Sequence, residues 1–463
     1  MKKFAWVMLT LLVALVAMSV YFLRDEPLTP LAEQALNYRP VPVPAEQNAF
    51  VGLVGLTAPA GSDFVQVGEE MIWRENLRQK PEQAVEKLAF SVKDYRYTCI
   101  REITENCLNE IWADAENIQK LLLENDTLIQ RYLKIQKMPI FSNYSMDVLS
   151  DSHFSLSGEA SQISRLLSAK AILDIKNGDI AQGLRWMEKD MAFYRKILAA
   201  KDVVIFDKVV AIAHIQRYAI FLSLLVENGK LRGQDEIVRA LLLPLDSHRE
   251  NLKKSTWREV VGFAQDMSHM MLNTRPDKLF EEYDFDERAH VEQNYSDKLI
   301  AYLKYYLMYK HNMTVNLQVE LWRHEMEIID TTPLSRLSDE NVEQKALERA
   351  GCTNAERIFC KHMKNYIGEV LVLIRGTNHS VSLLRIYDAD AFLRLARAQL
   401  EYQLAAKQPD ADPAKILASL PPETFNPYTG KPFDFDAERG VIGFQPAANR
   451  DKDRRVEIHL SLQ

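Results

Sequence analysis

Residues 161–198 read SQISRLLSAKAILDIKNGDIAQGLRWMEKDMAFYRKIL, and this stretch indicates the class of fold. Apolar side chains recur every three or four residues in 161–175 and again in 181–198, which is the period of an amphipathic helix. Asn177-Gly178-Asp179 separates the two runs. Its Gly suits a left-handed helix cap, and its Asp suits the start of the next helix. The sequence therefore predicts an αα-hairpin.

The same period continues through most of the chain. Only 16 glycines occur in 463 residues, which is low for an α/β enzyme with phosphate loops and tight strand connections. The further helical stretches that the pattern predicts are 81–138, 203–226, 235–242, 247–272, 296–330, 341–361 and 381–406. We therefore predict a mainly α protein, built as an irregular multi-helix bundle or an array of αα-hairpins.

The last forty residues differ in character. Turn-forming residues are dense in 426–432, and short strand-like runs follow at 433–436, 441–445 and 455–462. Glu438-Arg439-Gly440 supplies a turn between the first two runs. A small antiparallel β-sheet is expected to end the chain.

The N-terminus predicts a membrane anchor. Lys2 and Lys3 precede twenty uncharged residues, 4–23, which as a helix measure about 30 Å, the thickness of a bilayer's hydrocarbon core. The lysines favour a cytoplasmic start, so the rest of the chain is expected on the far side of the membrane. A cleaved signal peptide is the alternative, but the run is long for one and ends in Tyr21-Phe22-Leu23 rather than in a small-residue cleavage pattern.

Prolines and charge runs suggest the domain boundaries. Five prolines between 27 and 44 favour an extended, stiff tether. Residues 281–287 are strongly acidic and read as a solvated linker. The predicted order is an anchor at 1–26, a Pro-rich tether at 27–46, a helical domain at 47–280, an acidic linker at 281–295, a second helical region packed on the first at 296–420, and the β module at 421–463.

Four cysteines form two pairs with equal spacing, Cys99 with Cys107 and Cys352 with Cys360. In an extracytoplasmic chain four cysteines indicate two disulfides. Eight residues along an unbroken helix span about 12 Å, too far for a bridge, so local pairing requires a break in each segment. A helix-starting pattern after Cys352 supplies one break, and we predict Cys99–Cys107 and Cys352–Cys360. Zinc binding and buried free thiols are the alternatives.

Charge and motifs exclude several classes. The 57 basic and 64 acidic residues are interleaved, which does not mark a nucleic-acid binder. Phosphate loops, dinucleotide fingerprints and the Gly-x-Ser-x-Gly elbow are missing. His324-Glu325 begins like a zinc-protease helix, but Ile328 stands where its second histidine belongs, and Asp434, Asp436 and Glu438 depart from a calcium loop. The sequence predicts no cofactor and no metal.

Two short patterns carry a resemblance. Asn-Pro-Tyr-Thr-Gly-Lys-Pro at 426–432, followed by an aromatic strand and a Gly-bearing hairpin, resembles the terminal module of uncharacterised bacterial envelope proteins. The layout is similar, more distantly, to the strand end of type II secretion pseudopilins. Cys107-Leu108, Asn125 and Arg131-Tyr132 also resemble a pattern of such anchored helical proteins. The resemblance implies a bacterial envelope setting and brings no catalytic residue.

The expected function is therefore an interaction or structural role in the bacterial envelope, with the membrane as one partner through residues 4–23 and an envelope protein as another. The expected location is the inner membrane, crossed once, with the bulk of the chain in the periplasm, or a secreted form if the segment is cleaved. An envelope hydrolase acting on cell-wall or peptide substrates and a pilin-like assembly component are the alternative hypotheses.

Overall fold

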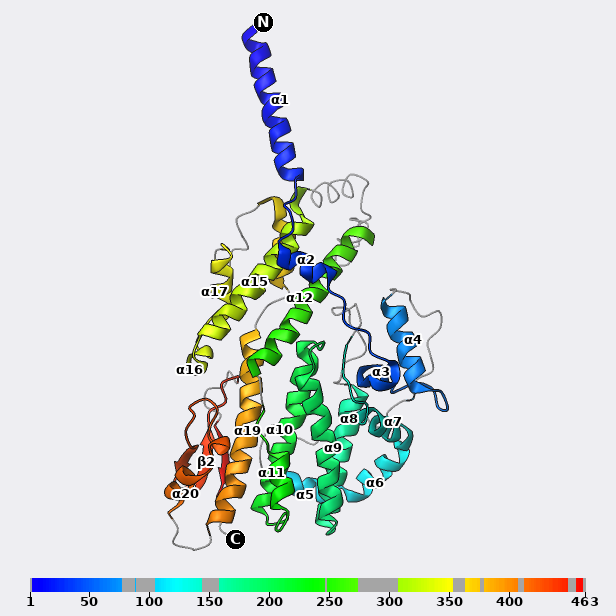
Figure 1. The fold of residues 1–463 in the computed structure, drawn as a ribbon, viewed down its shortest axis with the longest axis vertical. Helices are drawn as coiled ribbons and strands as arrows, with labels where there is room; N and C mark the ends of the chain where they lie inside the picture. Colours follow the sequence, from blue (N-terminus) through cyan, green and yellow to red (C-terminus); the bar gives the residue numbers. More distant parts are fainter. Residues whose placement is uncertain are drawn as a thin grey trace, which may run out of the picture. The chain divides into compact units, whose positions relative to one another are not determined.

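A computed structural model describes residues 2–76, 88, 105–143, 158–245, 248–273, 307–352, 363–374, 379–406, 412–448 and 455–460. These residues are mostly helical, with an apolar N-terminal helix and a small C-terminal sheet, as the sequence predicts (Figure 1). The α-helices are α1 (Lys2–Leu23), α2 (Pro30–Asn37), α3 (Ala49–Val54), α4 (Phe64–Asn76), α5 (Glu105–Ala113), α6 (Ala115–Glu124), α7 (Asp126–Gln136), α8 (Glu159–Lys176), α9 (Ile180–Ala199), α10 (Ile205–Glu227), α11 (Asp235–Leu241), α12 (His248–Asn273), α15 (His311–Thr331), α16 (Leu334–Leu337), α17 (Val342–Arg349), α18 (Tyr366–Ile374), α19 (His379–Ala405) and α20 (Pro413–Ser419). Short 3₁₀ turns lie at η1 (Ala45–Gln47), η3 (Met363–Asn365) and η4 (Pro422–Thr424).

The chain divides into two compact units. The anchor unit comprises residues 1–39, 259–332 and 340–378, and the main unit comprises 40–258, 333–339 and 379–463. This division differs from the predicted domains, because α19 and the β module belong with the helices of 40–258 rather than with a second helical region. A sequence pattern gives the length of a helix but not the neighbours against which its apolar face packs.

Four helices form the centre of the main unit. Helix α8 packs on α9, α9 on α10, and α10 on α19, so a helix from residue 379 onward closes a bundle begun near residue 159 (Figure 1). Their buried side chains form one hydrophobic core with α3, α7 and strand β2. Helix α10 is buried on most of its surface, and it is apolar enough to cross a membrane by length and composition alone. Its burial is that of a helix in the core of the main unit.

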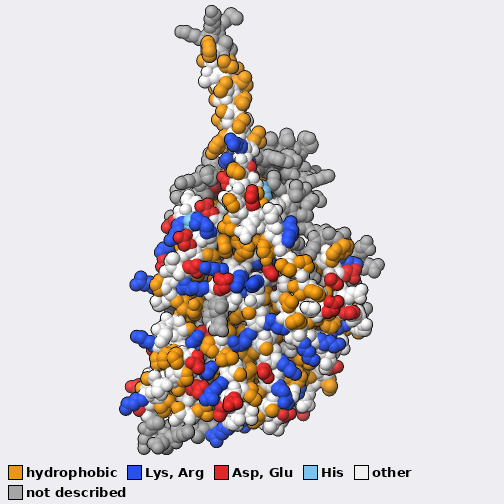
Figure 2. Space-filling view, viewed as in Figure 1, with side chains coloured by type: hydrophobic (Ala, Val, Ile, Leu, Met, Phe, Trp, Pro, Cys, Tyr) orange, Lys and Arg blue, Asp and Glu red, His pale blue; other side chains and the backbone are white. Residues whose placement is uncertain are grey.

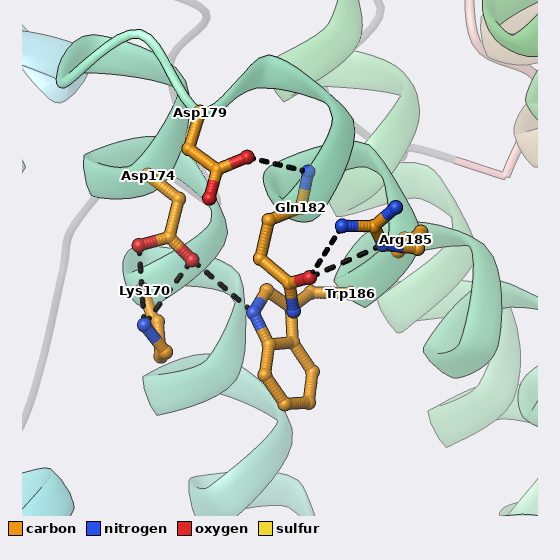
Figure 3. A network of polar contacts seen from close by, with 6 residues as sticks. All are labelled: Lys170, Asp174, Asp179, Gln182, Arg185 and Trp186. Atoms are coloured by element: carbon orange, nitrogen blue, oxygen red, sulfur yellow. Dashed lines mark hydrogen bonds and ion pairs between the residues drawn. The ribbon is translucent and has the colours of Figure 1, made fainter.

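The predicted αα-hairpin is confirmed at α8 and α9 (Figure 3). Gly178 adopts φ +93°, where a residue with a Cβ would be strained, and this ends the first helix. Asp179 then caps α9 by accepting a hydrogen bond from the amide of Gln182 at 3.2 Å. Asp174 pairs with Lys170 one turn earlier on α8 and, across the hairpin, accepts the indole N–H of Trp186 at 3.2 Å. These local contacts hold the two helices side by side.

The C-terminal sheet is also confirmed. Its antiparallel order is β1 (Asp434–Asp436), β2 (Val441–Phe444) and β3 (Val456–His459). Phe444 on β2 packs edge-to-face on Phe392 of α19, with ring centroids 5.4 Å apart. The sheet thereby contributes its apolar face to the core of the main unit.

The segment after α1 is not an extended tether throughout, and the prediction for 27–46 is wrong over α2. Thr29 accepts a hydrogen bond from the amide of Ala32, and Pro30 stands in the first turn, where a missing N–H costs nothing. The prediction of an extended chain rested on the number of prolines and neglected the preference of proline for the first turn of a helix. Residues 38–44 remain free of regular structure.

Within the anchor unit, residues 25–29 are bonded directly to α15, and we call these residues the juxtamembrane clasp because they follow α1, the candidate membrane anchor. The Asp25 carboxylate accepts the backbone amides of Asn312 and Met313, at 2.8 and 3.2 Å, and so caps the N-terminus of α15. One turn later, the Asn316 side chain accepts the Thr29 amide at 2.9 Å and donates to Glu26 at 2.8 Å. The chain leaving α1 therefore attaches to its own unit without a free spacer.

Candidate functional site

The structure describes two of the four predicted cysteine sites. Cys107 and Cys352 are both buried, and neither is a free thiol. Cys99 and Cys360 lie outside the described residues, as does the predicted acidic linker at 281–295, so the pairing Cys99–Cys107 and Cys352–Cys360 stays a prediction.

The residues considered as metal ligands do not form a metal site in the described part of the chain. His324 has Glu320 and Glu327 of its own helix 3.6 and 3.8 Å away, an arrangement of neighbours along one helix face. Asp436 uses its carboxylate to accept the amides of Glu438 and Arg439, which makes a hairpin turn rather than a calcium loop. Across the described ranges no group of three or more metal-ligating side chains converges.

A different set of polar side chains does converge, in the interior of the main unit, and we call it the Asp190 cluster. Helical spacing puts its members on the inward faces of four helices, three or four residues apart. The members are Tyr132 and Gln136 on α7, Ser161, Ser164 and Ser168 on α8, Asp190 and Tyr194 on α9, and His214, Arg217 and Tyr218 on α10. All but Gln136 are almost completely buried.

Asp190 is the centre of the cluster and accepts four hydrogen bonds. Its Oδ1 accepts from the hydroxyl of Tyr132 at 2.7 Å and from the amide of Gln136 at 2.6 Å. Its Oδ2 accepts from Tyr218 at 2.7 Å and from Ser164. A carboxylate has about four acceptor positions, so this one is saturated by side chains from three other helices. Burial and the charge of Asp190 raise the pKa of Tyr132 and Tyr218, which keeps both phenols protonated as donors.

His214 lies beside this carboxylate without touching it. Its ring stacks on Tyr194 with centroids 4.1 Å apart, and its Nε2 lies 2.8 Å from the Ser161 hydroxyl. On the other side, Nδ1 receives a contact from the guanidinium of Arg217. Burial first, and then the positive charges of Arg217 and Arg165, hold the pKa of His214 well below its usual range, so the ring is neutral.

The proton arrangement decides what this set can do. Two neighbours of Nδ1 bear on the tautomer of the neutral His214: the Ser164 oxygen, 3.0 Å away, would accept from a protonated Nδ1, whereas Arg217 only donates and needs Nδ1 as an acceptor. We assign the proton to Nε2, because a protonated Nδ1 would point at the donor of Arg217. Nε2–H therefore donates to Ser161, whereas a histidine that activates a serine must accept that serine's proton. The acid is also misplaced for a triad, because Asp190 bonds Ser164 rather than the histidine. Ser161, His214 and Asp190 therefore have the residue types of a catalytic triad but not its hydrogen-bond arrangement.

Two arginines complete the surroundings. Arg217 is 5% exposed and donates through Nη2 to Ser164 at 3.0 Å, while its Nε has no hydrogen-bond partner. Arg165 lies on α8 one residue after Ser164, is half-buried, and its Nε is likewise buried without a partner. Burial, followed by the charge of Arg217, lowers the pKa of Arg165. The two guanidinium groups therefore share one electrostatic environment.

Sequence reasoning did not find this cluster. Ser161, Ser164, Arg165 and Ser168 interrupt the apolar run of α8 at helical spacing, and His214 and Arg217 interrupt that of α10 in the same way. That pattern is a readable signal that polar groups face inward, but the sequence does not show which helices face one another. No family model, curated protein or solved structure matches the chain.

Proposed function

We propose that the chain is a single-pass, membrane-anchored interaction protein of the bacterial envelope. The observation that carries the proposal is α1, a 22-residue apolar helix whose described side chains, from Trp6 to Leu23, are exposed except for the partly buried Phe22 (Figure 2). A helix that is apolar on every side and exposed over most of its length suits the interior of a bilayer. The side of the membrane and the partner are part of the proposal, resting on Lys2 and Lys3 and on the resemblance of residues 426–432.

The juxtamembrane clasp supports a rigid connection between α1 and the anchor unit rather than a flexible linker. Asp25 and Asn316 attach the chain to α15 within a few residues of the end of α1. Lys364 of the same unit also lies over the ring of Tyr21, 5.2 Å from its centroid. In the proposed arrangement, the anchor unit is held at the membrane surface and the helices of the main unit present surface to a partner.

The anchoring and the compartment are tested by one mass measurement. Protein extracted from membranes is weighed intact, with thiols alkylated before or after reduction. A mass that includes residues 1–23, with four thiols labelled only after reduction, supports an anchored extracytoplasmic protein. Loss of the first twenty-odd residues overturns the anchor, and thiols labelled without reduction overturn the compartment.

The interaction role is tested by photo-crosslinking in living cells. Trp73, Leu123 and Phe206 are large apolar side chains that are more than half exposed, and each is replaced in turn by a photoreactive residue. Lys415, with a side chain 85% exposed, is the control position. Adducts at one or more apolar positions and none at Lys415 support a defined binding surface. Adducts no stronger than the control at all three positions count against the role.

An envelope hydrolase is the second candidate, favoured by the 2.8 Å contact between Ser161 and His214. The direction of the proton in that contact opposes it. A fluorophosphonate probe, which labels activated serines, distinguishes the two functions. Labelling that disappears in Ser161→Ala would establish the hydrolase, whereas an unlabelled protein leaves the interaction role as the better account.

A further inference from the structure

Arg165 on α8 and Arg217 on α10 place two guanidinium groups beside His214, and the described residues give neither group an ion pair. Nη2 of Arg217 contacts both Ser164 and His214, and its Nε has no hydrogen-bond acceptor. Arg165 has no hydrogen bond in the described part of the chain, and its Nε is buried. Burial first, and then the charge of Arg217, lowers the pKa of Arg165, and the same two causes together with the charge of Arg165 lower the pKa of His214.

This arrangement is costly unless an anion joins it. Removing a charge from water is unfavourable by several kcal/mol unless a partner of opposite sign or several hydrogen bonds replace the water. Asp190 does not serve as that partner, because its four acceptor positions are taken and it reaches Arg217 only through the Ser164 hydroxyl. The carboxylate nearest to Arg217 is thus already committed to other donors, and the described residues give Arg165 no carboxylate partner.

We propose that Arg165, Arg217 and Ser161 bind a small oxyanion carrying a phosphate group. Guanidinium groups recognise phosphate through paired N–H donors, and both Nε atoms here have a donor to spare. Ser161 adds a third donor, because its oxygen accepts from His214 and its own proton remains available. It is the third residue of α8, so the positive end of an 18-residue helix also favours an anion there.

Burial restricts the ligand to a small one. Ser161, His214 and Arg217 are each at most 5% exposed, and Tyr194 covers the histidine ring. Of the residues of this site, Arg165 alone is partly exposed, so the ligand is expected to enter along its side chain. A free phosphate ion and the phosphate of a small headgroup share this chemistry. The inference does not depend on the proposed interaction role.

The test uses full-length protein in detergent and two probes, inorganic phosphate and glycerol 3-phosphate, with ionic strength balanced by sodium chloride. Calorimetric titration of the wild-type protein is expected to show saturable binding of at least one probe. In Arg165→Gln the affinity for that probe is expected to fall at least tenfold, the loss of a charge-assisted hydrogen bond. Arg185→Gln is the matched control, because Arg185 is an exposed arginine bonded to Gln182 (Figure 3).

A second readout separates binding from salt effects. Without either probe, Arg165→Gln is expected to unfold at the same or a higher temperature than the wild type, because the repulsion from Arg217 is gone. With 10 mM phosphate the wild type is expected to gain about 2 to 4 °C in Tm, and Arg165→Gln only the small gain that phosphate gives any protein. Arg165→Lys restores the charge and is expected to recover part of the binding.

Each outcome bears on the proposal. Binding of inorganic phosphate or of glycerol 3-phosphate that is lost in Arg165→Gln supports it and identifies the source of the phosphate group. The site is overturned if neither probe binds the wild type, or if Arg165→Gln retains the wild-type affinity and Tm gain. Arg165→Gln unfolding well below the wild type in the absence of both probes would also contradict it, because Arg165 would then be stabilising by itself.

Discussion

The hydroxyl of Tyr428 donates to the carboxylate of Asp388 across 2.6 Å, and this bond attaches the Asn-Pro-Tyr-Thr-Gly-Lys-Pro loop to α19. The same carboxylate accepts the amides of Ala447 and Ala448 at 2.9 and 3.0 Å, so one buried aspartate holds two separate segments of the C-terminal module. The loop closes on itself through the Asn426 and Lys431 backbones, and Gly430 supplies the positive φ of +65° that the turn needs. The motif that carried the resemblance therefore has a clear structural task.

Removal of this hydroxyl is expected to loosen the module. Tyr428→Phe keeps the ring but leaves Asp388 one donor short in a buried position, which should cost about 1 to 3 kcal/mol. Urea unfolding measures the loss, and limited proteolysis should show earlier cleavage near the C-terminus. Lys431→Ala, an exposed change in the same loop, is the control and is expected to stay within about 0.5 kcal/mol of the wild type. Equal effects of the two changes would show that the bond contributes nothing.

The Asp190 cluster predicts a larger effect. Asp190→Asn keeps the shape but brings an NH₂ group among four donors that need acceptors, and we expect a loss of about 3 to 5 kcal/mol in unfolding free energy. Asp174→Asn is the matched control on the neighbouring helix, where the carboxylate serves Lys170 and Trp186 near the surface (Figure 3). Its loss should be about 1 kcal/mol or less. Comparable losses at the two positions would contradict a central role for Asp190.

The fold class was predictable and the cluster was not, for one physical reason. Apolar spacing along a helix is a local property, so 161–198 predicts its hairpin and 426–462 its turn and strands. The Asp190 cluster depends instead on which face of α7 meets α9 and α10, and that is set by packing between segments that are far apart in the sequence. Pro30 led to the wrong prediction of an extended tether, because proline favours the first turn of a helix but disrupts its interior.

The juxtamembrane clasp predicts a local change rather than global unfolding. Asn316→Ala removes the side chain that accepts from Thr29 and donates to Glu26, so residues 25–29 should detach from α15. Hydrogen exchange at the amide of Thr29 is expected to speed up about tenfold, the equivalent of one lost hydrogen bond. Gln344→Ala, on an exposed face of α17 in the same unit, should leave that rate unchanged. An unchanged rate in Asn316→Ala would show that other contacts hold the segment.

Lys208 predicts a dependence of stability on pH. This lysine is 2% exposed, and its ammonium donates to the carbonyls of Leu198 and Asn251 at 2.8 and 3.0 Å. Burial, with a smaller contribution from the charge of Lys254, lowers its pKa to about 7. The unfolded chain, with an ordinary lysine pKa near 10.4, then binds more protons than the folded chain between those two values.

Stability therefore rises with pH across that window as far as Lys208 is concerned, because the neutral amine still donates both hydrogen bonds and no longer costs the burial of a charge. Relative to Lys208→Met, the wild type should gain up to about 5 kcal/mol between pH 7 and pH 10.5. Urea unfolding of both proteins over this range measures the difference, in which all other titrating groups cancel. The exposed Lys415→Met change should give no such slope. A parallel pH dependence of the wild type and Lys208→Met would mean that Lys208 remains charged in the fold.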